Sequence, residues 1–201
     1  MISVKCVGAP LAAPACKVLN KEHDWRTFYM AIRYILQGED PALRKKSRVV
    51  TDYNKRLHIL LDDMRETLHE ANGLGLAAPQ VGVLRRVVLV VEFIRSEETL
   101  EERIVELINP EIVESSGEQN GSEGCLSVPG IYGMVTRPEL VRVSAHDRYG
   151  EVFEYQCEGL AARAVCHELD HLNGVIFTSL TDHFLTDEEL EKMRAERDAK
   201  Q

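Results

Sequence analysis

The run His167-Glu168-Leu169-Asp170-His171 constrains this chain more than any other feature of it. On a helix, positions i and i+4 lie on one face, about one turn apart. Two imidazoles at that spacing can hold one metal ion, while the glutamate beside the first reaches a water molecule on the metal. A short motif also arises by chance on exposed helices, so other segments have to supply the remaining groups of a metal site.

Cys125 is the candidate third ligand. A catalytic metal usually has three protein ligands and one open position, and the helix supplies only two. Cys125 follows a turn-like Ser122-Glu123-Gly124 segment, from which a loop could aim it at the helix; the alternative is a buried small side chain. With a Cys/His/His set, the metal would lower the pKa of a bound water toward about 7 and make it the nucleophile. Glu168 would accept its proton and later deliver it to the leaving amine.

Other residues share the helix face of His167 by the same spacing rule. Leu160 and Ala164 would wall an apolar pocket beside the metal, although core packing is an equal reading of Leu160. We expect Arg163 to extend its charged head to solvent, with its stem on the pocket rim. Asp170 could accept the second N–H of a metal-bound imidazole, and a salt bridge or a helix cap is the alternative.

Composition excludes several classes of protein. A length of 201 residues fits one domain, and 44% hydrophobic with 28% charged residues is ordinary for a soluble globular protein. The net charge of -9 argues against DNA or RNA binding by bulk electrostatics, and no apolar run approaches the length of a membrane span. Five cysteines, an odd number without disulfide-framework spacing, favour free thiols in a reducing cytosol.

The chain divides near Met30. Residues 1–29 contain prolines and small residues without helical or strand periodicity, and their apolar stretch is too weak for a convincing secretory signal. We interpret residues 1–29 as an N-terminal extension of uncertain status, or as the product of a start assigned too far upstream, and residues 30–201 as the catalytic domain.

Hydrophobic periodicity predicts the helices. Apolar residues spaced three or four apart predict a helix from Asn54, which Gly73 would end as a left-handed cap. A second helix is expected over residues 159–172. Thr186 and Glu189 form a capping box for a last helix that ends near residue 199.

Short β-branched runs predict the strands, at residues 86–91, 104–108, 111–114, 140–146 and 152–157. The last two would form a hairpin. Because strands and helices do not alternate as βαβ units, the pattern favours an α+β fold rather than an α/β fold.

Three separate segments resemble the sequence motifs of one family, the peptide deformylases. The segments are Gly73-Leu74-Gly75-Leu76-Ala77-Ala78-Pro79-Gln80, Glu123-Gly124-Cys125-Leu126-Ser127 and His167-Glu168-Leu169-Asp170-His171-Leu172-Asn173-Gly174. Their order and spacing agree with the family, and the resemblance runs from Met30 through at least Phe177.

The resemblance implies roles for particular residues. Cys125, His167 and His171 would bind the metal, and Glu168 would be the general acid/base. Gln80 and the backbone N–H of Leu126 would donate to the tetrahedral oxyanion. The substrate would contact Gly73, Leu74, Gly75, Leu160 and Ala164, with its backbone along the glycine segment as an added strand. Asp170, Glu123 and Arg137 would support the ligands, the last two as an ion pair that braces the cysteine loop.

The resemblance also implies a fold, a reaction and a cofactor. The fold would be α+β, with antiparallel or mixed strands wrapped around the metal-binding helix and a helix at the C-terminus. The reaction would be hydrolytic removal of the N-formyl group from the initiator methionine of nascent chains, releasing formate. One Fe²⁺ per chain would be the native metal, replaceable by Zn²⁺ or Ni²⁺. The enzyme would be bacterial and cytoplasmic, would meet the ribosome transiently, and would use neither DNA nor a membrane.

Some residues depart from the family pattern, and two other functions stay open. Cys166, Arg163 and Tyr132 differ from common family residues, which affects side-chain preference rather than chemistry. A general metalloendopeptidase would take a glutamate after Asp182 as its ligand. A non-catalytic ribosome- or peptide-binding relative would be expected to lack Glu168 or a ligand.

Overall fold

The structure is a computed structural model that describes residues 31–95 and 100–198. The expected extension at residues 1–29 therefore lies outside the described residues. The helices and strands are, in chain order, α1 (Lys55–Glu70), β1 (Gly75–Ala77), β2 (Val87–Arg95), β3 (Leu100–Ser116), β4 (Gln119–Cys125), β5 (Val128–Arg137), β6 (Leu140–His146), β7 (Val152–Glu158), α2 (Gly159–Leu172) and α3 (Asp187–Asp198). Short 3-10 helices cover Pro41–Arg44, Ala78–Val81 and Phe177–Ser179.

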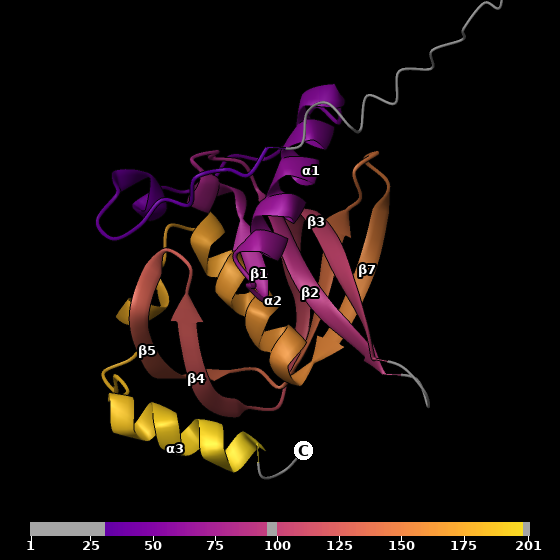
Figure 1. The fold of residues 1–201 in the computed structure, drawn as a ribbon. Coiled ribbons are helices and arrows are strands. Elements are labelled where there is room, and N and C mark those ends of the chain that lie inside the picture. The colour runs from indigo at the N-terminus through magenta and orange to yellow at the C-terminus, as the bar shows by residue number, and fades with distance from the viewer. Residues whose placement is uncertain (1–30, 96–99, 199–201) are drawn as a thin grey trace, which may run out of the picture.

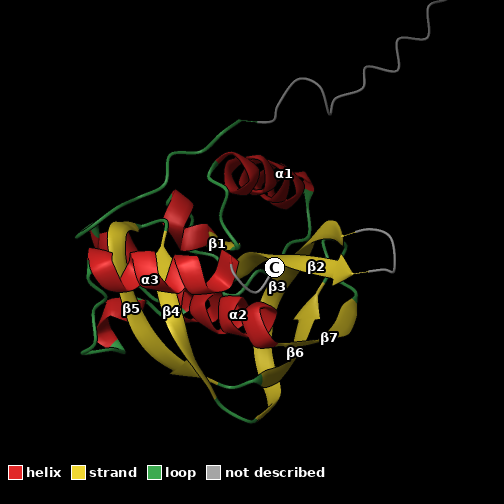
Figure 2. Cartoon of the chain, turned by 60° about the horizontal axis from the view of Figure 1, so that its bottom comes forward, coloured by secondary structure: helices red, strands yellow, loops and turns green. Residues whose placement is uncertain are grey.

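Two antiparallel sheets enclose the helix α2. Five strands pair in the order β1-β2-β3-β6-β7, and β4 pairs with β5 as a separate hairpin. The helix lies between the five-stranded sheet and the hairpin, and α1 covers the other face of the sheet (Figures 1 and 2). The fold is α+β, as predicted, with strands around a central helix and a helix at the C-terminal end.

Residues 87–91 of the strand β2 are buried on both faces, which explains their unbroken apolar run. Val88 and Val90 pack toward α2, whereas Val87, Leu89 and Val91 pack with the residues of α1. A strand covered on both sides loses the alternation of apolar and polar residues that a half-exposed strand shows. The sheet therefore forms the middle layer between two helices.

The helix α2 is buried on nearly all sides. Ten of its 14 residues are buried, because the sheet covers one side and the hairpin the other. This environment differs from that of α1, whose single apolar stripe faces the sheet. Polar residues on α2 must therefore find partners inside the protein.

The predicted ends of the helices are largely confirmed. The side chain of Asn54 accepts hydrogen bonds at the start of α1, and Thr186 and Glu189 form the expected capping box before α3. The prediction for Gly73 is wrong: Asn72 adopts the left-handed conformation, with φ of 50°. Asparagine tolerates this conformation better than most residues other than glycine.

Two predictions about strands are wrong. The strands expected at residues 104–108 and 111–114 are one continuous strand, β3, whose pairing with β6 shifts register between Ile108 and Glu111. A bulge of this kind lets a strand pass Asn109-Pro110 without ending. The segment before Cys125 is not a turn but the strand β4, and its glycines and polar residues concealed it.

The hairpin of β6 and β7 is confirmed, with Leu140 opposite Glu158 and His146 opposite Val152. The carboxylate of Asp147 accepts hydrogen bonds from the backbone N–H of Tyr149 and Glu151 and so closes the turn. Over the part of the chain that is described, no helix is long and apolar enough to cross a membrane.

We predict that deleting residues 1–29 leaves the melting temperature nearly unchanged. The first tertiary contacts that the structure describes come later, where the N–H of Ala31 and the guanidinium of Arg33 bind the carboxylate of Asp63 on α1. As a control, a longer deletion through Tyr34 would leave that buried carboxylate unpaired and lower the melting temperature by roughly 5 °C. A large loss of thermal stability from the shorter deletion would contradict the domain boundary at Met30.

Candidate active site

Three potential ligands converge between α2 and the end of β4. His167 and His171 lie one turn apart on α2, and Cys125 is the last residue of β4. Their donor atoms all lie within 4.8 Å of one another, and Cys125 Sγ is 3.2 Å from His171 Nε2. Two imidazoles and a thiol at this separation fit a divalent ion of the zinc or iron type.

The pKa values of the two imidazoles are shifted in opposite directions. Burial alone would lower the pKa of His167, but hydrogen bonds to Cys125 and Glu123 outweigh it and raise the pKa to about 10. Burial and the neighbouring charge of His167 lower the pKa of His171 to about 3. A cation binding to His167 would therefore have to displace the proton of that imidazole, since metal ligands bind in their deprotonated form.

The carboxylate of Glu123 connects the ligands to the surrounding structure. Its Oε2 accepts a hydrogen bond from His167 Nδ1 at 2.9 Å, which directs His167 Nε2 to the cluster. Arg137 donates from Nε and Nη2 to the two oxygens, at 2.8 and 2.9 Å. The expected ion pair between Glu123 and Arg137 is thus present. Burial would raise the pKa of Glu123, but the bonds from Arg137 and His167 lower it to about 2.

Two expectations for this network need correction. In the described part of the chain, His167 Nδ1 bonds to Glu123 rather than to Asp170, and Asp170 Oδ2 accepts from Arg137 Nη1 at 2.6 Å, which was the alternative reading of this residue. Arg163 does not extend to solvent. It is 6% exposed and donates to Glu123 and to backbone carbonyls of the hairpin. The first half of α2 is otherwise made mostly of small and apolar residues. A cationic side chain in such a segment indicates that its charge has a partner inside the protein, and this signal was present in the sequence.

Glu168 lies beside the cluster with one oxygen unpaired. It is 4% exposed, and its buried Oε2 finds no hydrogen-bond partner in the described part of the chain. Burial raises the pKa of this carboxyl to about 7. An unpaired buried oxygen is costly in a structural role, whereas a general base needs a free oxygen and a pKa near neutrality.

The missing side chain of Gly75 gives Glu168 its space. A Cβ at position 75 would lie 2.5 Å from Glu168 Oε1 and 2.7 Å from its Cγ. We expected the missing side chain of this glycine to let the substrate backbone approach. The Glu168 side chain instead occupies the space where a side chain at position 75 would lie. The glycine therefore lets β1 and α2 approach closely enough to bury the carboxylate.

Gln80 is placed at the same cluster. It is 1% exposed, its Oε1 accepts from Ala77 N at 2.8 Å, and its Nε2 lies 3.2 Å from Ser127 Oγ and 3.7 Å from Cys125 Sγ. The side chain thus caps the 3-10 helix Ala78–Val81 and also points an amide group at the thiol. Ser127 lies within one of the sequence motifs, but no role was predicted for it; its hydroxyl accepts a hydrogen bond from that amide.

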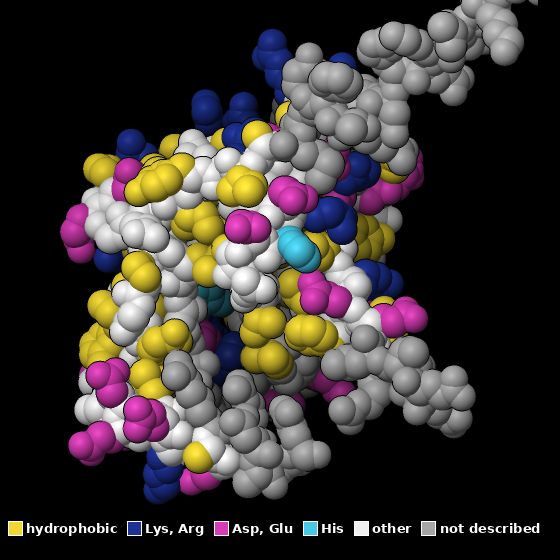
Figure 3. All heavy atoms as spheres, in the orientation of Figure 1, with side chains coloured by type: hydrophobic (Ala, Val, Ile, Leu, Met, Phe, Trp, Pro, Cys, Tyr) yellow, Lys and Arg dark blue, Asp and Glu magenta, His cyan; other side chains and the backbone are white. Residues whose placement is uncertain are grey.

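A cavity of about 610 Å³ opens onto the cluster. All five expected substrate residues line it, as does Leu126: Gly73, Leu74, Gly75, Leu160 and Ala164. Figure 3 shows the hollow, with apolar side chains around it and a histidine inside. Leu160 is 54% exposed, so it belongs to the cavity wall rather than to the core.

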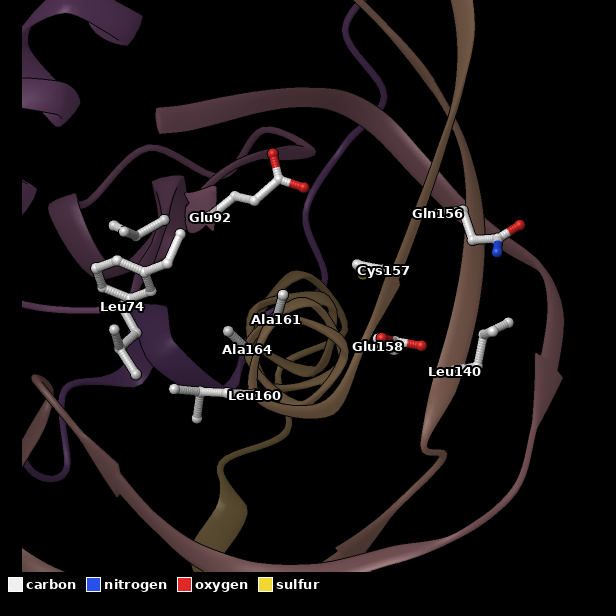
Figure 4. A pocket seen from close by; sticks show the side chains of 11 residues that line it. Leu74, Glu92, Leu140, Gln156, Cys157, Glu158, Leu160, Ala161 and Ala164 are labelled. Atoms are coloured by element: carbon white, nitrogen blue, oxygen red, sulfur yellow. The ribbon is translucent and has the colours of Figure 1, made fainter. Parts of the chain in front are cut away.

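A second cavity, of about 420 Å³, adjoins the first and shares Leu74, Leu160 and Ala164 with it. In Figure 4, Leu160 and Ala164 project from α2 toward Leu74, while Cys157 lies on the other side of the helix. Leu74 and Leu160 therefore form the boundary between the two cavities.

A helix that bears a His-Glu-x-x-His run and faces a cysteine is typical of a metallohydrolase site. A family profile described as polypeptide deformylase matches residues 32–185. The peptide deformylase of Caldicellulosiruptor bescii is 50% identical over 169 residues, which cover 84% of this chain and 97% of the relative.

Solved structures agree with this assignment. A peptide deformylase from Legionella pneumophila superposes with a TM-score of 0.68 at 39% identity, over 83% of this chain and 98% of the relative. A class I type b peptide deformylase from Acinetobacter baumannii, solved with Met-Ala-Ser bound, gives 0.69 at 35% identity, over 75% and 99%. The chain belongs to the peptide deformylase family and is an enzyme of that family.

We predict that Glu123→Gln destabilises the metal-free protein by about 3–5 kcal/mol at pH 7, because two buried arginine side chains lose their carboxylate. The folded pKa near 2 lies below the ordinary value of 4.5, so the carboxylate stabilises the fold fully above pH 4.5. This contribution disappears as the pH falls toward 2.

Urea unfolding of parent and variant at pH 7, 4 and 3 measures this effect. The difference between their free energies of unfolding should shrink as the pH falls. Glu114→Gln is the control, because Glu114 pairs with Arg142 on the exposed sheet face, where an ion pair contributes at most about 1 kcal/mol. Equal losses in the free energy of unfolding for the two substitutions would contradict the conclusion that Glu123 connects the ligands to the surrounding structure.

Proposed function

We propose that this enzyme hydrolyses the N-terminal formyl amide of formyl-methionyl nascent polypeptides, with formate and a free amino terminus as products. The observation that carries the proposal is the buried carboxylate of Glu168, which lies beside the Cys/His/His cluster at the cavity and whose Oε2 has no hydrogen-bond partner in the described part of the chain. Membership of the peptide deformylase family supports it. The enzyme would act in the cytoplasm on chains that leave the ribosome, which it would meet transiently.

Cys125, His167 and His171 would hold one metal ion, Fe²⁺ by family resemblance, with Zn²⁺ or Ni²⁺ as substitutes. When bound, such an ion acts as a Lewis acid and lowers the pKa of a coordinated water. The donor set fits this group, since a thiolate and two imidazoles leave one position open. Asp170, Glu123 and Arg137 would keep the ligands in place through the ion pairs described above.

Glu168 would move the protons of the reaction. Its free oxygen accepts a proton from the attacking water and returns it to the nitrogen of the methionine as the formyl C–N bond breaks. The pKa near 7 suits both transfers. Gln80 Nε2 and the backbone N–H of Leu126 would donate to the oxyanion, and Ser127 holds the Gln80 amide for this purpose.

The edge strand β1 would bind the peptide. It is the first strand of the five-stranded sheet and pairs with β2 along one side, and no strand among the described residues pairs with its other side, which could take an extended chain. Gly73, Leu74 and Gly75 line the cavity at this edge, and the methionine side chain would contact Leu74, Leu160 and Ala164. The bound Met-Ala-Ser of the Acinetobacter baumannii relative supports a peptide that begins with methionine.

We expect Glu168→Gln to retain the metal and lose at least 10²-fold in kcat, because the amide cannot accept a proton. The assay is formate release from formyl-Met-Ala-Ser, with metal content measured on the same samples. Glu158→Gln is the control, since Glu158 is an exposed glutamate just before α2. A metal-loaded Glu168→Gln enzyme that keeps most of its activity would remove Glu168 from this role.

Gly75→Ala should also lower kcat, by roughly 10²-fold, because the added methyl group displaces the Glu168 carboxylate by about an ångström. Gly73→Ala is the comparison and should lose less activity than Gly75→Ala, although Gly73 lies on the same proposed peptide path. A Cβ there meets the ends of the Leu126 and Leu68 side chains at 2.9 and 3.0 Å, and such flexible atoms can move aside. If kcat falls by a comparable factor in both variants, the glycines are needed for the path of the peptide and not for the placement of Glu168.

A further inference from the structure

Arg163 ties together the two elements that supply the ligand cluster. It lies on α2, one turn before His167, and its Nη1 donates to Gly121 O at 3.1 Å and to Val135 O at 2.8 Å. Its Nη2 donates to Gln119 O at 3.2 Å. These carbonyls belong to both strands of the β4–β5 hairpin, and β4 ends at Cys125. A single guanidinium thus joins the helix of the histidines to the strand of the cysteine.

The same guanidinium also holds the Glu123 carboxylate. Oε1 accepts from Arg137 Nε at 2.8 Å and from Arg163 Nη1 at 3.0 Å, while Oε2 accepts from Arg137 Nη2 and from His167 Nδ1. With both oxygens occupied in this way, the carboxylate has one orientation in which Oε2 faces His167. The orientation of that carboxylate decides which imidazole nitrogen faces the cluster.

Position 121 is adapted to this arginine. A Cβ on Gly121 would lie 3.1 Å from Arg163 Nη2 and 3.3 Å from its Cζ, so a side chain there would push against the guanidinium. Gly121 pairs with Val135 across the hairpin, and Arg163 binds the carbonyls of both residues. The glycine therefore opens the space in which the planar group lies across the two strands.

We infer that Arg163 is a positioning residue for the ligand cluster, with Gly121 as its steric counterpart. It fixes the distance between α2 and β4 and the orientation of Glu123, and so the direction of His167 Nε2 and the place of Cys125. The inference rests on the proposed metal role of the cluster. A lysine cannot replace the arginine, because a single ammonium cannot reach the hairpin carbonyls and the carboxylate as a planar fork does.

The test compares metal affinity in full-length variants Arg163→Met, Arg163→Lys and Gly121→Ala. The Zn²⁺ dissociation constant is measured by competition with a chelator, and the absorption spectrum of the Co²⁺-loaded protein reports the ligand geometry. We expect Arg163→Met and Arg163→Lys to bind Zn²⁺ 10- to 100-fold more weakly, the usual cost of losing a partner behind a ligand. Gly121→Ala should act in the same direction by a smaller factor, and all three should alter the Co²⁺ spectrum.

Asn120→Ala is the matched control. Asn120 Nδ2 donates to Thr136 Oγ1 on the exposed side of the same hairpin and does not contact Glu123. It should leave the Zn²⁺ affinity and the Co²⁺ spectrum at parental values even if the melting temperature falls.

A folded Arg163→Lys variant with parental Zn²⁺ affinity and Co²⁺ spectrum would overturn the inference, and so would a Gly121→Ala variant with both unchanged. If Arg163→Met does not fold, the other two variants decide. Formate release by the parent protein tests the proposed function separately. An inactive parent that binds Zn²⁺ tightly would refute the reaction and leave the positioning test intact.

Discussion

The buried carboxylate of Glu123 is the group on which the site depends. It lies on β4 and accepts hydrogen bonds from His167 on α2 and from arginines on β5 and α2. Removing a carboxylate from water costs several kcal/mol unless its oxygens are fully paired, and here four donors meet them. Helix and hairpin are therefore coupled: neither can shift without leaving a buried charge unpaired. The cluster that Cys125 shares with the two histidines is held by this coupling, because its members come from the same two elements.

Close packing of β1 against α2 is the second constraint, and it serves the reactive group rather than the ligands. Gly75 lets the strand approach until Glu168 Oε1 occupies the space of a side chain. The approach removes Glu168 from water and leaves its Oε2 without a hydrogen-bond partner among the residues that the structure describes. An enzyme can maintain such an unfavourable group only if the rest of the helix is firmly anchored. The apolar contacts of α2 with β2 and β7 supply that anchoring.

How far the sequence predicts this structure depends on the range of the interactions involved. Local signals, such as the cap at Asn54 and the capping box of Thr186 and Glu189, were read correctly because they act over a few residues. The hairpin of β4 and β5 was not predicted, since its glycines make room for side chains that the local sequence does not indicate: Gly121 for Arg163 on α2 and Gly124 for the ring of Tyr132, its partner on the opposite strand. The environment of Arg163 was predicted wrongly for the same reason, and the salt bridge of Asp170 was one of the alternatives that the sequence left open. The position of each residue on its helix is compatible with several partners, and the tertiary structure determines which of them it contacts.

The two glutamates of the site show how environment separates their roles. Both are buried, yet hydrogen bonds lower the pKa of Glu123 to about 2 while burial raises that of Glu168 to about 7. The difference follows from pairing: Glu123 meets two guanidinium groups, whereas Glu168 meets the backbone of a glycine and the cavity. A carboxylate that must hold a ligand benefits from permanent charge, and one that must exchange protons benefits from a pKa near the working pH. The negative charge of Glu123 adds to the effect of burial and raises the pKa of Glu168 further, while the charges of His167 and Arg137 act in the opposite direction. The carboxylate that holds the ligand therefore also helps to keep its neighbour protonatable near neutral pH.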